Sequence, residues 1–278
     1  MSVVAIIGAG DVGGAIAHTL ARRSRFREVR LIDAALGVAQ GKALDIRQSG
    51  PVDHFDTVLS GAGDVLDAIG AAVIIVADAI GDGEWEGERG LALVGRIVRA
   101  GGNAPIVFAG AKQTWLMEAA VRELGVPSHR MVGAAPGALV GAVRALVSLE
   151  MDGASRDVAV SVVGRPPTFV VAWAAASVGG SAIADRVPAH RLLAISDSLR
   201  RLWPTGPQAV AAVTAEIAEG LAFGSRRELP AVTVLDGEFG VRRVAAMLPV
   251  ELGAGRVLRR ILPTLSSRER VDFLNTLS

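Results

Sequence analysis

Three glycines near the amino terminus have the spacing of a phosphate-binding turn. Gly8, Gly10 and Gly13 follow the β-branched run Val3–Ile7 and precede an alanine-rich stretch. Glycines between a strand and a helix permit a tight bend and the close approach of a pyrophosphate, and the helix N-terminus offers free N–H groups. The pattern predicts a dinucleotide site with contacts from the turn residues Gly8, Ala9, Gly10, Asp11, Val12 and Gly13.

Asp33 is the second feature of this predicted site. It follows the predicted strand Glu28–Ile32, twenty residues after Gly13. A carboxylate at this point can accept hydrogen bonds from both ribose hydroxyls and would repel a 2′-phosphate, so NAD is predicted in preference to NADP. The alternative, a structural glycine turn beside a solvated aspartate, is disfavoured by the strand–turn–helix context.

The composition excludes several classes of protein. Hydrophobic residues make up 51% of the 278 residues, which excludes a disordered polyelectrolyte, and the net charge of +1 predicts neither a nucleic-acid nor an anionic-membrane partner. The absence of Cys excludes disulfides and thiolate chemistry, and the four His are not paired in sequence, so we expect no metal site. An uncharged stretch, residues 166–184, is broken by Pro and Gly. We therefore expect a cytoplasmic protein without a membrane span.

Strands and helices alternate along the first half of the chain. We expect strands at Val3–Ile7, Glu28–Ile32, 71–77, 105–109 and 131–134, and helices at 15–21, 39–47, 91–99 and 115–124. Such alternation predicts a Rossmann-type doubly wound parallel sheet in residues 1–142. The pattern then changes to an α+β domain in residues 143–278, with strands at 158–163 and 232–235 and helices at Ala189–Leu202, 208–222 and 267–277.

Several segments resemble the lactate/malate dehydrogenase family. They are IIGAGDVGGAIAHTLA, LIDA, QGKALDI, GVPSHRMVG (residues 125–133) and LPAVTVLDGEFGVRRVAAMLPVELGAGRVLRRI (residues 229–261). The last block is specific, because a generic Rossmann protein would lack it. The resemblance implies an NAD(H) cofactor, a C-terminal substrate-type domain and assembly into a homodimer or homotetramer.

The resemblance fails at the positions that carry the family's chemistry. That chemistry uses an acid/base His, an Asp that orients it, an Asn near the nicotinamide and Arg residues that clamp the substrate carboxylate. An alignment without gaps from residue 71 to residue 172 places Pro166 at the His, Leu139 at the Asp, Ala111 at the Asn, and Ala142, Gly81 and Gly87 at the Arg positions. The sequence therefore predicts that 2-hydroxy acid dehydrogenase activity is lost or nearly lost.

Neighbouring arginines are weak candidates for replacing the lost clamp. Arg89, Arg144 and Arg165 each lie within two residues of a vacated position. A shift of two residues on a helix turns a side chain by about 200°, which counts against Arg144. Arg165 lies by analogy beside the nicotinamide end, although an ordinary ion pair is the favoured role for it.

The loop of residues 81–90 could supply an acid. It carries four carboxylates against one arginine, where the family's loop is cationic. Asp78, just before this loop, and Glu84 or Glu86 within it could act as an acid or base if buried, because desolvation raises the pKa of a carboxyl group. A glycine-rich acidic loop is more typical of a solvated loop, and Trp85 at its tip could cover a ligand or anchor a partner.

Four functions remain open from the sequence. The favoured one is an NAD(H)-binding protein without catalytic activity. The alternative is an NAD-dependent oxidoreductase acting on a neutral or cationic substrate. A malate or lactate dehydrogenase that uses displaced arginines is disfavoured by Pro166 and the acidic loop, and a structural protein without NAD affinity is disfavoured by the intact glycine turn.

Overall fold

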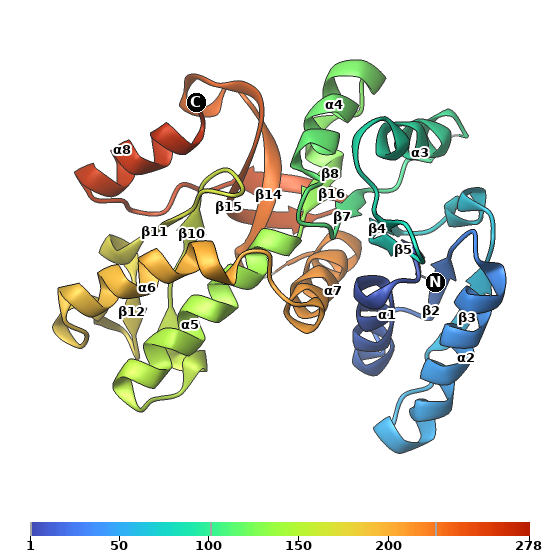
Figure 1. The fold of residues 1–278 in the computed structure, drawn as a ribbon, viewed down its shortest axis with the longest axis horizontal. Helices are drawn as coiled ribbons and strands as arrows, with labels where there is room; N and C mark the ends of the chain where they lie inside the picture. The colour runs from blue at the N-terminus through green and yellow to red at the C-terminus, as the bar shows by residue number, and fades with distance from the viewer. Residues whose placement is uncertain (1, 101, 226) are drawn as a thin grey trace.

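A computed structural model describes residues 2–100, 102–225 and 227–278. Within these residues, nine strands form one sheet in the order β16-β15-β14-β8-β7-β4-β1-β2-β3 (Figure 1). The six strands from β3 to β8 are parallel: β1 (Val3–Ile7), β2 (Glu28–Ile32), β3 (Val58–Ala62), β4 (Val73–Val76), β7 (Ile106–Phe108) and β8 (Met131–Gly133). The doubly wound parallel sheet predicted from the sequence is confirmed.

The C-terminal part of the chain extends this sheet with antiparallel strands. These are β14 (Leu229–Asp236), β15 (Arg242–Gly253) and β16 (Arg256–Arg260). β14 joins the parallel half through a single residue pair, Val232 with Gly133, whereas β14 and β15 pair along nearly their whole length. Both halves of the chain therefore contribute to one continuous sheet.

Helices cover both faces of the sheet. They are α1 (Asp11–Arg23), α2 (Leu36–Asp53), α3 (Gly87–Arg99), α4 (Thr114–Leu124) and α7 (Pro207–Phe223). Side chains of β4 alternate between the faces: Val73 and Ile75 join the core under α1, α2 and α7, and Ile74 and Val76 join the core under α3 and α4. Because both faces are buried, the strands read as uninterrupted apolar runs, which is typical of parallel sheets.

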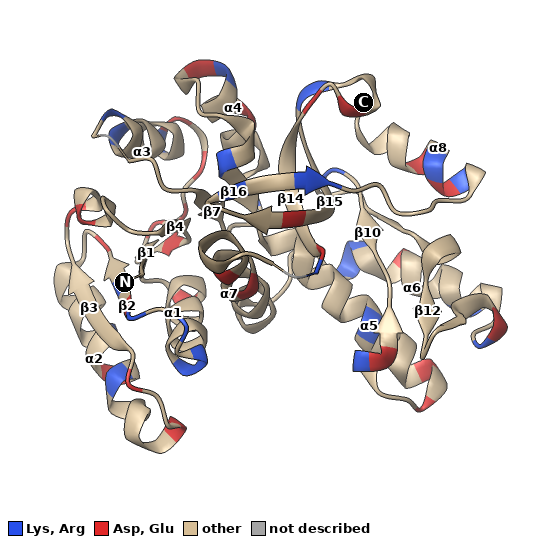
Figure 2. Cartoon of the chain, turned by 180° about the vertical axis from the view of Figure 1, so that it is seen from behind, with Lys and Arg blue, Asp and Glu red and all other residues tan. Residues whose placement is uncertain are grey.

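Residues 138–202 form two α-helices and two small antiparallel sheets outside the main sheet, and we call these residues together with the C-terminal helix the second lobe. The helices are α5 (Ala138–Met151) and α6 (Ala189–Leu202), and the strands are β9 (Val158–Ala159), β10 (Val162–Val163), β11 (Val170–Val171), β12 (Ser177–Val178) and β13 (Ser181–Ala182). The strand expected at 158–163 is thus two short strands in different sheets. The proposed boundary between residues 142 and 143 lies within α5, so this helix connects the two lobes. Basic and acidic residues are distributed along the elements of both lobes (Figure 2).

The chain ends on α8 (Ser267–Thr276), which lies at the outer end of the second lobe (Figure 1). Ser266 and Glu269 form a reciprocal capping box at its start. Phe273 is completely buried among Val163, Leu235 and Leu248, and its ring meets Phe239 edge-on with centroids 5.2 Å apart. Phe273 therefore packs the helix against β14 and β15.

We expect Phe273→Ala to lower the free energy of unfolding by about 3–5 kcal/mol, because the substitution removes buried apolar surface and leaves a cavity. Leu274→Ala is the matched control, since Leu274 is 40% exposed on the same helix. Urea unfolding followed by circular dichroism measures both variants. Equal losses from the two would contradict the anchoring role of Phe273.

Candidate functional site

The parallel half of the sheet creates a crevice at the carboxyl ends of its central strands. The strand order reverses between β1 and β4, because β2 and β3 lie on one side of β1 and β4, β7 and β8 lie on the other. Open α/β sheets bind ligands at such a reversal point. Around it lie the glycine turn after β1, Asp33 after β2 and the loop after β4.

The glycine turn has the tight geometry that the sequence predicts. Gly8 has a φ of +107°, and a side chain there would collide with the backbone of Asp78. A side chain at Gly13 would collide with the carbonyl oxygen of Gly8. The Lys42 ammonium fixes the turn from the other side, since Nζ donates hydrogen bonds to the carbonyls of Ala9 and Gly10 at 2.8 and 2.9 Å.

Asp33 is only 6% exposed and lies at the end of β2 as predicted. Its Oδ2 accepts hydrogen bonds from the amides of Ala9 at 2.9 Å and Ile80 at 3.0 Å. Its Oδ1 accepts one from the amide of Ala35 at 3.0 Å. Asp33 therefore connects the loops after β1, β2 and β4 through these hydrogen bonds. Much of the hydrogen-bonding capacity of its carboxylate is used within the chain.

Asp78 binds the N-terminus of α1. Its Oδ1 accepts a hydrogen bond from the Gly13 amide at 2.8 Å, and its Oδ2 accepts one from the Val12 amide at 3.2 Å. A side chain at Gly10 would collide with this same carboxylate. These two amides carry the positive end of the helix dipole, which is the position that a pyrophosphate occupies in the predicted dinucleotide site. The chain fills that position with its own carboxylate.

Glu84 makes a similar contact with the loop after β7, at the same edge of the sheet. Its Oε1 accepts from the Ala111 amide at 3.0 Å, and its Oε2 accepts from the Lys112 amide at 2.9 Å. Asp78 and Glu84 are cross-strand partners in a two-stranded hairpin, β5 (Asp78–Ala79) with β6 (Gly83–Glu84). We call residues 78–84 the acidic hairpin. Glu84 is thus bound to backbone rather than solvated as the loop composition indicates, whereas Glu86 is exposed and pairs with Lys112 at 3.3 Å.

Arg89 holds the acidic hairpin in place. Its guanidinium donates to the carbonyls of Asp82 at 3.1 Å and Glu84 at 2.7 Å, and forms an ion pair with the Asp82 carboxylate at 2.9 Å. It also lies 4.8 Å from the ring centroid of Trp85. Arg89 therefore acts within the loop in this structure. Arg144 is also engaged by backbone, since it donates to the carbonyls of Ser155 and Arg156.

A small cavity of about 220 Å³ adjoins the acidic hairpin. Ile7, Ile32, Val65 and Leu93 supply apolar walls, and Asp33, Trp85, Arg89 and Arg96 are among the other lining residues. Pockets that hold drug-sized ligands measure about 300–1,000 Å³. The cavity is therefore suited to a single heterocycle, and a whole dinucleotide would have to extend beyond it.

A dinucleotide cofactor fits this arrangement only in part. The glycine turn permits close approach of a ligand, and the cavity beside Asp33 could take one ring. The two amides at the N-terminus of α1, however, already hold the Asp78 carboxylate. As the residues are arranged, the diphosphate of NAD(H) does not fit.

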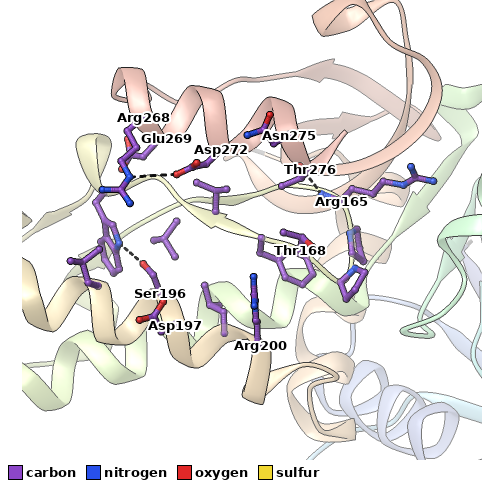
Figure 3. A pocket seen from close by; sticks show the side chains of 18 of the residues that line it. Arg165, Thr168, Ser196, Asp197, Arg200, Arg268, Glu269, Asp272, Asn275 and Thr276 are labelled. Carbon is purple, nitrogen blue, oxygen red and sulfur yellow. Dashed lines mark hydrogen bonds and ion pairs between the residues drawn. The ribbon is translucent and has the colours of Figure 1, made fainter. Parts of the chain in front are cut away.

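Pro166 lies on the wall of a broad cavity of about 1130 Å³ in the second lobe, between α6, α8 and the β10–β11 hairpin (Figure 3). Proline has no titratable group and no N–H, so it cannot move a proton. Arg200 extends from α6 toward this cavity, and the Trp173 indole donates to Ser196 Oγ at 2.8 Å beside it.

Two other vacated positions lie on α5. Leu139 is fully buried in the core, and Ala142 is half-buried.

Arg165 forms an ion pair with Glu118 of α4. Its Nη2 lies 3.1 and 3.2 Å from the two carboxylate oxygens, and its guanidinium points away from the large cavity (Figure 3). Glu118 is 8% exposed and also accepts a hydrogen bond from the Ala245 amide at 2.8 Å. The pair joins α4, β15 and the segment after β10, which is a structural role.

Two histidines with interactions that affect a pKa lie outside the crevice. His18 Nε2 is 3.2 Å from Asp53 Oδ2, and this hydrogen bond is the main factor that lowers the pKa of the Asp53 carboxyl. Burial lowers the pKa of His129, and the nearby Arg256 lowers it further. Among the described residues, no group of three His, Cys, Asp or Glu could hold a metal ion. No helix in the described ranges is long and apolar enough to cross a membrane.

We expect Arg165→Met to lower the free energy of unfolding by about 2–3 kcal/mol, because it leaves the buried Glu118 carboxylate without its countercharge. The loss is smaller than for a fully buried pair, since the Arg165 side chain is 34% exposed. The double variant Glu118→Gln/Arg165→Met should recover part of this loss. Urea unfolding of the three proteins measures the effect, and an unchanged stability of Arg165→Met would argue against a structural role.

The chain is similar in sequence to malate dehydrogenases over nearly its whole length. The enzyme of Thermomicrobium roseum is 30% identical over 285 residues, which cover 96% of this chain and 92% of the relative. The enzyme of Desulforudis audaxviator is 28% identical over 295 residues, covering 99% and 95% of the two chains. No family model matches the sequence.

Comparison with solved structures shows that the chain has the fold of malate and lactate dehydrogenases. The structure of malate dehydrogenase from Salinibacter ruber has a TM-score of 0.86 at 27% identity and covers 99% of this chain and 93% of the other. The minor L-lactate dehydrogenase of Enterococcus mundtii has a TM-score of 0.87 and covers 99% and 95% of the two chains, at 21% identity. At that identity, the likeness concerns the fold alone.

Proposed function

Because the chain belongs to the lactate/malate dehydrogenase family, we propose that it is a dehydrogenase-like member that has lost 2-hydroxy acid dehydrogenase activity. The observation that carries this proposal is the acidic hairpin. Asp78 and Glu84 place two carboxylates at the edge of the sheet where the family's loop is cationic. The substrates of the reaction are anions, so this charge opposes their binding.

The vacated positions support the same proposal. Pro166 offers no acid/base group, and Leu139 and Ala142 offer neither an orienting carboxylate nor a cation. Ala111 has no side-chain amide, and its backbone amide is held by Glu84. Arg89, Arg144 and Arg165, which could have replaced the clamp, are each engaged elsewhere. Loss of the acid/base alone removes about 10²–10⁴ in rate, and loss of substrate positioning adds to it.

NAD(H) is the cofactor that membership of this family implies, and Asp33 would oppose the 2′-phosphate of NADP(H). The glycine turn supports a ligand of this class, and the engaged α1 amides oppose its diphosphate. We therefore derive no hydride-transfer step for this chain.

Purified protein should not oxidise NADH with oxaloacetate or pyruvate above the protein-free rate. We expect turnover to be about 10⁴-fold or more below that of an active malate dehydrogenase in the same assay. Loss of absorbance at 340 nm measures the reaction. Turnover in the ordinary range of about 1–10³ s⁻¹ would contradict the proposal.

We also propose that the chain forms a homodimer or a larger homo-oligomer. Three exposed apolar side chains lie within about 120° of one another around α2 and support a contact with a second copy: Val38, Leu44 and Val52. Exposed apolar surface that is gathered on one side is typical of protein interfaces.

Leu44→Glu should shift the solution mass toward that of the 28.6 kDa monomer, because it places a charge within the proposed interface. Leu149→Glu is the matched control, since Leu149 is 79% exposed on α5 and far from α2 in sequence. Light scattering after size-exclusion chromatography measures the mass. A wild-type protein that is already monomeric would contradict the interface.

A further inference from the structure

The N-terminus of α1 already holds an anion supplied by the chain. Both oxygens of Asp78 are engaged there, on the Val12 and Gly13 amides at 3.2 and 2.8 Å. The Gly10 amide also donates to the backbone carbonyl of Asp78 at 2.9 Å. Backbone and side chain of the same residue therefore occupy the Gly10, Val12 and Gly13 amides, three of the donors that a diphosphate would use.

The backbone of Asp78 cannot move away by itself, because the acidic hairpin is fixed at several points. Glu84, its cross-strand partner, is bound to the Ala111 and Lys112 amides. Arg89 binds the carbonyls of Asp82 and Glu84. Asp78 therefore stays beside the glycine turn even when its carboxylate rotates and gives up the Val12 and Gly13 amides.

The small cavity beside Asp33 is left accessible by this arrangement. Its apolar walls, Ile7, Ile32, Val65 and Leu93, suit a flat heterocycle, and its volume of about 220 Å³ is below that of sites for larger ligands. A ligand without phosphate can enter it and leave Asp78 in place. A ligand with a diphosphate has to displace a carboxylate and then remain beside that negative charge.

We propose that the Asp78 carboxylate takes the place of the diphosphate of a dinucleotide. The crevice then binds a phosphate-free heterocycle of nucleoside size in preference to a dinucleotide. Asp78 thus determines the specificity of the cleft. This inference concerns binding alone, and it stands or falls independently of the loss of dehydrogenase turnover.

Calorimetric titration of the full chain with adenosine, ADP and NADH tests the proposal. Wild-type protein should bind ADP and NADH no more tightly than adenosine, because Asp78 already occupies the Gly10, Val12 and Gly13 amides. Asp78→Ala should bind ADP and NADH about tenfold or more tightly than wild type, with the affinity for adenosine changed less than about threefold. Asp78→Asn, which keeps the shape of the side chain, should show a gain in the same direction if the alanine variant folds poorly.

Glu88→Gln is the matched control for charge. Glu88 is exposed in the first turn of α3, so its neutralisation changes the net charge as much as Asp78→Asn does without touching α1. This variant should bind all three ligands as wild type does. The proposal is overturned if wild-type protein binds ADP or NADH at least about tenfold more tightly than adenosine, if neither Asp78 variant gains affinity for them, or if Glu88→Gln gains as much.

Discussion

Backbone amides at the carboxyl edge of the parallel sheet need acceptors, and this chain supplies them from three of its own carboxylates. Asp33, Asp78 and Glu84 together accept hydrogen bonds from seven amides on the loops after β1, β2, β4 and β7. An amide left without a partner in a buried site costs about 1–3 kcal/mol, and hydrogen bonds to charged groups are the stronger ones. The conformations of these loops are consequently interdependent, because each carboxylate joins segments distant in sequence.

The same arrangement determines the electrostatics of the crevice. Like charges opposite one another in a hairpin are destabilising, yet Asp78 and Glu84 are cross-strand partners. Each is compensated by a pair of amides, so the hairpin tolerates both. A further anion has no such compensation, and at about 4 Å from one of these carboxylates it would be repelled by about 4 kcal/mol at an effective dielectric constant of about 20. Asp78 and Glu84 therefore oppose the binding of a further anion beside them.

Local sequence signals were sufficient for most of the elements and insufficient for the contacts between them. The strands β1 and β2 and the helix α6 have the bounds that the sequence predicts, since each has an uninterrupted apolar or amphipathic pattern. The strand β3 was missed because Val58–Ala62 is partly exposed and contains glycine, which weakens the periodic signal. The run 158–163 reads as one strand but divides between two sheets. The hydrophobic periodicity of a segment does not show which sheet each part of the segment joins.

The chemistry of the site was predicted in part for a similar reason. The glycine turn and Asp33 lie close together in sequence, and their spacing identifies them. Asp78 reaches Gly13 across 65 residues, and Arg165 reaches Glu118 across 47. The identity of an acidic or basic residue does not reveal such a partner, so the sequence left Asp78 and Arg165 as candidates for chemistry. Their hydrogen bonds in the structure give both residues structural roles.

The carboxylate on α1 also changes how the fold depends on its surroundings. A ligand that binds only the folded state raises stability by about 2.7 kcal/mol at a concentration 100 times its Kd, so a protein with an open cofactor cleft becomes more or less stable as the cofactor pool varies. Here the anion that satisfies the Val12 and Gly13 amides is part of the polypeptide. It is present at every cofactor concentration, and its contribution does not fall by dilution. Under the proposal above, the stability of the folded chain would not depend on the supply of dinucleotide.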